Sequence, residues 1–104
     1  MKDEMIIQFA SQFRKGLLNN NISQGMCFAV CVPLQSLLSI GGIETELKIV
    51  DFKNNNHAFL IFNDGRILDP TADQFPASGL PAVYLGSMPD CYTAWMQESI
   101  SEVF

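Results

Sequence analysis

The chain has few basic residues: six Lys and Arg side chains stand against eleven Asp and Glu, for a formal net charge of −5. A protein that binds the phosphate backbone of a nucleic acid normally presents a basic face, so this balance argues against nucleic-acid binding. Long apolar runs are also missing. The longest, Met26–Leu34, is far shorter than the roughly 20 residues that span a bilayer, so we expect no association through a membrane-spanning segment.

The sequence also lacks a targeting segment and a disulfide pattern. Its first residues, MKDEMIIQF, carry two acidic side chains and no long apolar stretch, unlike a signal peptide. Three cysteines are an odd number, and none belongs to the C-x2-C pair that is typical of zinc sites. We therefore expect reduced thiols, no metal or other cofactor, and a cytoplasmic location, with export as an effector left open.

No repeat, low-complexity tract or linker divides the 104 residues, and 48 % of them are hydrophobic. This length and composition predict one globular domain over 1–104. Apolar residues at helical spacing predict a helix at each end of this domain. Residues 3–18 are predicted to form a helix with one apolar face, made of Met5, Ile6, Phe9, Phe13 and Leu17. A last helix should begin near Asp90, which could cap it, and carry this apolar stripe: Tyr92, Trp95, Met96, Ile100 and Val103.

The middle of the chain predicts one more helix followed by strands. The helix should begin near Cys27 and end at Gly41-Gly42, with Pro33 either kinking it or standing in the first turn of a shorter helix. Strand-like segments follow at 44–52, 57–62, 66–69 and 82–85. Helices, then strands, then a helix indicate an α+β fold in which the N-terminal helices pack on a small antiparallel sheet.

Cys27 is a candidate nucleophile. It follows Gly25-Met26 at the predicted start of a helix, where unpaired amides and the helix dipole lower the pKa of a thiol. A thiolate attacks a carbonyl carbon, and the same amides could hold the oxyanion that forms. The alternative role for Cys27 is that of a small buried apolar residue. Cys31, among apolar neighbours, is better explained as part of the core, and Cys91 has no partner in the sequence.

His57, the only histidine, opens an apolar strand, and Asp69 closes the next one. The two could form an imidazole–carboxylate pair, although a surface histidine and a turn-starting aspartate before Pro70 are the plainer alternatives. The length of the turn between the two strands decides whether the side chains of His57 and Asp69 can meet. A two-residue turn puts the two side chains on opposite faces of the sheet. A three-residue loop, with Gly65 left-handed, puts them on one face as diagonal neighbours within reach of a hydrogen bond.

Two glutamines are further candidates. Gln24 could donate its side-chain amide to an oxyanion, and Gln74, which follows the Asp69 segment, could line the site. For both, an exposed or loop-stabilising role is an equally good explanation.

The segments GMCFAV…LQSLLSIGG and NHAFLIFNDGRILDPTADQF resemble the core of the transglutaminase-like branch of the papain-like cysteine fold. The similarity covers roughly residues 25–75 and is most specific at His57-Ala58-Phe59, Asp64-Gly65 and Asp69-Pro70-Thr71. Papain-fold bacterial toxins and effectors share the arrangement. The resemblance implies a papain/transglutaminase-like core with Cys27 as nucleophile, His57 as general base and acid, and Asp69 as the residue that orients the imidazole.

The expected function is thiol-dependent acyl transfer on an amide or ester carbonyl of a protein or peptide substrate. Peptidase, amidase, glutamine deamidase and transglutaminase chemistry share these steps, and the sequence does not choose among them. The alternative is a non-catalytic binding or regulatory module of the same fold. A homodimer through the stripe on the last helix is also possible, although packing of that stripe on the protein's own core is favoured.

Overall fold

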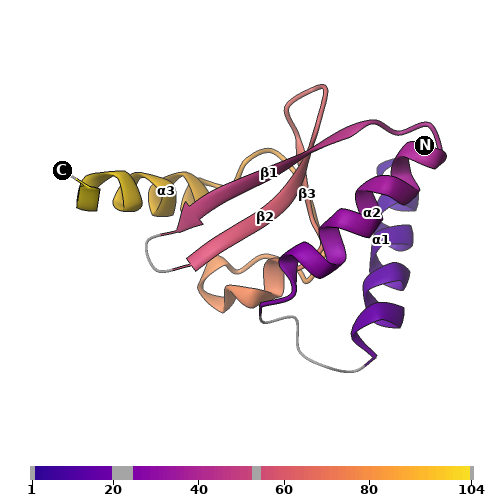
Figure 1. The fold of residues 1–104 in the computed structure, drawn as a ribbon, viewed down its shortest axis with the longest axis horizontal. Helices are drawn as coiled ribbons and strands as arrows, with labels where there is room; N and C mark the ends of the chain where they lie inside the picture. The colour runs from indigo at the N-terminus through magenta and orange to yellow at the C-terminus, as the bar shows by residue number, and fades with distance from the viewer. Residues whose placement is uncertain (1, 20–24, 53–54, 104) are drawn as a thin grey trace.

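The computed structural model describes residues 2–19, 25–52 and 55–103. Two helices, α1 (Asp3–Leu18) and α2 (Cys27–Ile40), precede four strands, β1 (Thr45–Phe52), β2 (Asn55–Phe62), β3 (Ile67–Asp69) and β4 (Tyr84–Gly86). The short 3₁₀ turns η1 (Ala72–Gln74) and η2 (Pro76–Ser78) join β3 to β4, and α3 (Asp90–Val103) follows. The strands form one antiparallel sheet in the order β1-β2-β3-β4 (Figure 1). The predicted α+β class with an antiparallel sheet is confirmed.

Helices cover both faces of the sheet. Side chains alternate between faces along a strand, and the two sets here belong to two separate apolar clusters. One cluster joins α1 and α2 to one face, and its buried members are Ile6, Ala10, Cys31, Leu34, Leu38, Leu60, Phe62, Leu68 and Val83. The other joins α3 to the opposite face, and its buried members are Val50, Phe52, Phe59, Ile67 and Tyr92. Figure 1 shows α1 and α2 at one end of the sheet and α3 at the other.

The predicted inner face of α1 is only partly right. The residues of α1 that are buried are Ile6, Ala10 and Leu18, whereas Met5, Phe9 and Leu17 are exposed. The apolar arc of this helix is wider than the surface offered by α2 and β4, the elements against which α1 packs. Only the part of the arc centred on Ile6 and Ala10 is therefore covered.

The helix α2 begins at Cys27, as predicted, and continues through Pro33 to Ile40. Proline lacks an amide hydrogen, so the helix loses one internal hydrogen bond there without ending. Tertiary packing explains this tolerance, because Val30, Cys31 and Leu34 on either side of the proline are fully buried. Among the helices of the described chain, none is long and apolar enough to cross a bilayer.

The hairpin between β2 and β3 has the three-residue register. Leu60 pairs with Leu68 and Ile61 with Ile67, so the same register places Asp69 opposite Phe59. The amide of Phe62 donates to the carbonyl of Arg66, which closes the loop Asn63-Asp64-Gly65. Gly65 has a φ of 89°, the left-handed conformation that this loop requires. His57 and Asp69 are consequently on the same face of the sheet.

We expect Gly65→Ala to lower the free energy of unfolding by about 1–2 kcal/mol, measured by urea denaturation. The cost is conformational, because an L-residue in the left-handed region brings its Cβ close to the carbonyl oxygen. No heavy atom lies within 4 Å of the added Cβ among the described residues. Gly16→Ala, in the interior of α1 and equally open, is the matched control and should stabilise by about 0.5–1 kcal/mol. A Gly65→Ala protein as stable as the wild type would contradict the assigned loop conformation.

Candidate active site

His57 and Asp69 form a buried pair. His57 is on β2 and Asp69 is the last residue of β3, and neither side chain is exposed to solvent. The His57 Nε2–H donates to Asp69 Oδ2 across 2.6 Å. The diagonal contact that the sequence predicted for a three-residue loop is therefore present. Because a carboxylate accepts, Nε2 is the imidazole nitrogen that carries the proton in this hydrogen bond.

Asp69 uses its two oxygens for different partners. Oδ2 accepts from His57 and also from the hydroxyl of Tyr92, at 2.5 Å. Oδ1 accepts from the backbone amide of Thr71 at 3.0 Å, the side-chain hydrogen bond that stabilises a turn at Asp-Pro. The two interpretations of Asp69 drawn from the sequence thus both hold: one oxygen stabilises the turn, and the other binds the imidazole.

Tyr92 is a site residue that the sequence analysis did not assign. It is on α3, fully buried, and its hydroxyl reaches Asp69. Burial and the neighbouring Asp69 both raise the pKa of Tyr92, so the hydroxyl stays protonated and acts as a donor. The one available signal was its place on the apolar stripe of the last helix. A buried tyrosine normally needs a hydrogen-bond partner, but the sequence does not say which.

Cys27 is the first residue of α2 and lies beside His57. Burial raises the pKa of the Cys27 thiol, but the interaction with His57 and with the backbone of Ala58 and Phe28 outweighs burial and lowers that pKa below its ordinary value. A helix start also contributes amides that have no acceptor within the helix. The thiol therefore has the surroundings that favour a thiolate.

His57 offers Cys27 its second nitrogen. Because Nε2 is bound to Asp69, Nδ1 is the atom left for the thiol; it is buried and has no hydrogen bond of standard geometry within the described part of the chain. Catalytic hydrogen bonds are often long without substrate. Burial lowers the pKa of His57, but Asp69 and Cys27 outweigh burial and raise that pKa to about 9. The pKa of Cys27 is thus lowered and that of His57 raised, so each of the two groups favours the charged form of the other.

Aromatic rings surround the imidazole. Ring centroids lie 4.8 Å from His57 for Phe75, 5.5 Å for Phe52, 5.8 Å for Tyr92 and 6.0 Å for Phe59. These rings exclude water from the Asp69 hydrogen bond. They also fix the ring plane, so that Nδ1 keeps its direction.

Gln74 joins the two halves of the site. Its Oε1 accepts from the amide of Gly25, two residues before Cys27, and its Nε2 donates to the hydroxyl of Thr71, two residues after Asp69. Gln74 is therefore positioned beside the site, with its carboxamide holding loops together. The other candidate, Gln24, lies outside the described residues.

Arg14 on α1 anchors the segment after Asp69. It forms a bidentate ion pair with Asp73, at 2.9 and 2.8 Å, and donates to the carbonyl of Pro70 at 3.0 Å. Planar two-point contact between Arg and a carboxylate gives such pairs geometric specificity. Nothing in the sequence pattern points to Arg14, because its partners are more than 50 positions away.

The other two cysteines have different surroundings. Cys31 is fully buried, and its thiol donates to the carbonyl of Ala58 at 3.4 Å. Burial, with Asp69 and Cys27 adding to it, raises the pKa of Cys31 far above its ordinary value, so this thiol stays protonated. Cys91, on α3, is half-buried. Across the described residues no three His, Cys, Asp or Glu side chains gather to hold a metal ion.

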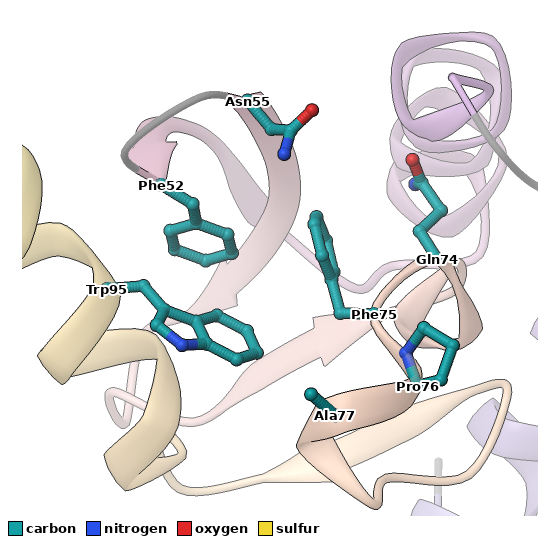
Figure 2. Close-up of a pocket in the computed structure, with 7 residues that line it drawn as sticks. All are labelled: Phe52, Asn55, Gln74, Phe75, Pro76, Ala77 and Trp95. Carbon is teal, nitrogen blue, oxygen red and sulfur yellow. The ribbon is translucent and has the colours of Figure 1, made fainter.

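A pocket of about 310 Å³ adjoins the site (Figure 2). Its lining residues are Phe52, Asn55, Gln74, Phe75, Pro76, Ala77 and Trp95. Figure 2 shows the rings of Phe52, Phe75 and Trp95 around a common space. Two of these rings, Phe52 and Phe75, are among those that contact His57, so the pocket lies one ring away from the imidazole.

Comparison with known proteins adds no relative: no protein-family model, no curated protein and no solved structure matches the chain.

Proposed function

We propose that the chain is a thiol-dependent acyl-transfer enzyme of transglutaminase-like or papain-like type, with Cys27 as nucleophile, His57 as general base and acid, and Asp69 as the residue that orients His57. The observation that carries the proposal is the order of the three groups. One nitrogen of His57 binds Asp69, and the other, which is buried and has no hydrogen bond of standard geometry among the described residues, lies on the side of Cys27.

The chemistry follows from this order. The Cys27 thiolate attacks the carbonyl carbon of an amide, and the S–C bond forms as the carbonyl π electrons move to oxygen. The C–N bond then breaks, and the proton on His57 Nδ1 goes to the leaving amine. In the second half, His57 takes a proton from water or from a second amine as that nucleophile attacks the thioester. The S–C bond breaks and the thiolate is restored.

Asp69 orients the imidazole in both half-reactions, formation of the acyl-enzyme and its release. Its carboxylate fixes the Nε2–H tautomer and stabilises the imidazolium, and its own geometry is fixed by Tyr92 and Thr71. The oxyanion is assigned to backbone amides at the start of α2, where a helix has unpaired donors.

One observation favours the alternative, a non-catalytic module of the same fold. Only 4 % of Cys27 is exposed, which leaves little access for a carbonyl to Sγ. A module that merely binds a partner needs no access to this thiol.

Alkylation of the three cysteines tests the choice. At pH 6 we expect iodoacetamide to modify Cys27 fastest in the folded protein, with Cys31 slowest, as followed for each cysteine by mass spectrometry of its peptide. Attack needs a thiolate, and of the two thiols on α2 only that of Cys27 has a lowered pKa. The urea-unfolded chain is the control, in which the advantage of Cys27 should vanish. Equal rates in the folded protein, or the fastest rate at Cys91, would contradict the assignment of Cys27 as nucleophile and favour the non-catalytic binding module.

A further inference from the structure

We propose that the pocket beside His57 binds an apolar, aromatic-sized side chain of a peptide substrate, next to the carbonyl that Cys27 attacks. This inference rests on the proposed function, and it adds the class of substrate to it. The pocket is formed by the end of β1, the start of β2, the η1–η2 segment and α3.

The walls of the pocket select for an apolar group. Phe52, Phe75 and Trp95 pack edge to face or tilted, with ring centroids 5.3–5.7 Å apart, and so form a continuous aromatic surface. Pro76 and Ala77 add further apolar surface, and no charged side chain is among the residues that line the pocket. Burial of a charged substrate group here would be costly, because nothing would pair with it. At about 310 Å³ the pocket is at the small end of ligand sites, which suits one side chain.

The polar groups of the pocket suit the backbone of a peptide. Asn55 begins β2, two residues before His57 on the same face of the sheet, and its exposed carboxamide has no hydrogen-bond partner within the described chain. Gln74 lies between the pocket and Gly25 in the loop before Cys27. The neutral amide of Asn55, beside an aromatic surface, can bind a peptide N–H or C=O group while the substrate side chain occupies the pocket.

The position of the pocket connects its occupant to the reacting groups. Phe75 contacts the imidazole edge to face at 4.8 Å, and Gln74, its neighbour in the chain, is bonded to the segment that leads into Cys27. An occupant resting on Phe75 is therefore one ring away from His57, and it lies beside the loop that leads into Cys27. A side chain held there would place its own backbone carbonyl at the nucleophile.

Two chloromethyl ketones of matched reactivity test the pocket. In each, the Cys27 thiolate displaces chloride, so that an S–C bond forms and the C–Cl bond breaks. We expect N-acetyl-phenylalanyl chloromethyl ketone to modify Cys27 about tenfold faster or more than N-acetyl-glycyl chloromethyl ketone, relative to Cys91 in the same molecule. Equal rates for the two probes at Cys27 would overturn the proposal.

Two variants test whether the preference for the phenylalanyl probe depends on the pocket. Ala77→Phe fills the pocket from an exposed lining position and should reduce the ratio of the two rates at Cys27 to about one, with each rate measured relative to Cys91. Ala94→Phe, at an exposed position next to Trp95 that does not line the pocket, is the matched control and should keep the wild-type ratio. A ratio that survives in Ala77→Phe, or that is lost equally in Ala94→Phe, would contradict the assignment.

Binding can also be measured without any reaction. Trp95 is the only tryptophan of the chain, so its fluorescence reports the pocket directly. In Cys27→Ala we expect N-acetyl-phenylalanine methylamide, but not the glycine compound, to change that fluorescence saturably. Failure of iodoacetamide to select Cys27 would refute the proposed enzyme, whereas selective iodoacetamide labelling with no phenylalanine preference and no fluorescence change would refute the pocket alone.

Discussion

Replacement of His57 by alanine is expected to slow thiol-dependent turnover by at least about 10²-fold, and to slow the alkylation of Cys27 at pH 6 as well. Without the imidazole, the largest remaining influence on Cys27 is burial, which raises the pKa of the thiol, so the thiolate fraction falls. General acid–base help is commonly worth 10²–10⁴-fold, and no second histidine exists to replace it.

The same molecule supplies the control for this experiment. Cys91, on α3, should react at its wild-type rate in the variant, because it is not part of the pair. His57 is fully buried, so His57→Gln, which leaves a smaller cavity, should accompany His57→Ala, with circular dichroism of both. A folded variant of either kind that keeps the wild-type rate at Cys27 would show that His57 does not activate the thiol.

The pairing of His57 with Asp69 was predictable because one local feature determines it. Asn63-Asp64-Gly65 allows two loop lengths, and the two place the pair on opposite faces or on the same face of the sheet. Gly65 suits the left-handed position of the longer loop, and the structure has that loop. The start of α2 at Cys27 was predictable for a similar reason, since Gly25 precedes it and apolar residues follow.

The environment of the pair was not predictable, because it depends on contacts between distant segments. Tyr92 reaches Asp69 only because α3 packs on the far face of the sheet, and Arg14 reaches Asp73 across 59 positions. The buried face of α1 was predicted only in part: amphipathic spacing identified an apolar arc, but which part of it is covered depends on the shape of α2 and β4. Local patterns thus indicated where Cys27, His57 and Asp69 lie, and tertiary packing determined which residues surround them.

Asp69→Asn should shift the pH dependence of Cys27 alkylation to higher pH. An amide has no charge to stabilise the imidazolium, so the pKa of His57 falls and the pKa of Cys27 rises with the loss of its cationic neighbour. Asparagine also has only one acceptor oxygen, whereas three donors, from His57, Tyr92 and Thr71, point at the carboxylate. One donor is left unsatisfied in a fully buried site, and we expect about 1–3 kcal/mol of lost stability by urea denaturation. Thiol-dependent turnover by Asp69→Asn should still exceed turnover by Cys27→Ala, which has no nucleophile.

Tyr92→Phe should shift the same profile in the opposite direction, to lower pH. The tyrosine hydroxyl and His57 Nε2 share Asp69 Oδ2, and each donor draws on the same negative charge. Removal of the hydroxyl leaves more of that charge to His57, so the pKa of His57 rises further and the Cys27 thiolate persists to lower pH. A purely structural role for Tyr92 would lower stability without moving the profile. Because Asp69→Asn and Tyr92→Phe both remove one hydrogen bond from the same buried site, a pair of profiles displaced in the same direction would contradict the electrostatic coupling of Tyr92 to Cys27 through Asp69 and His57.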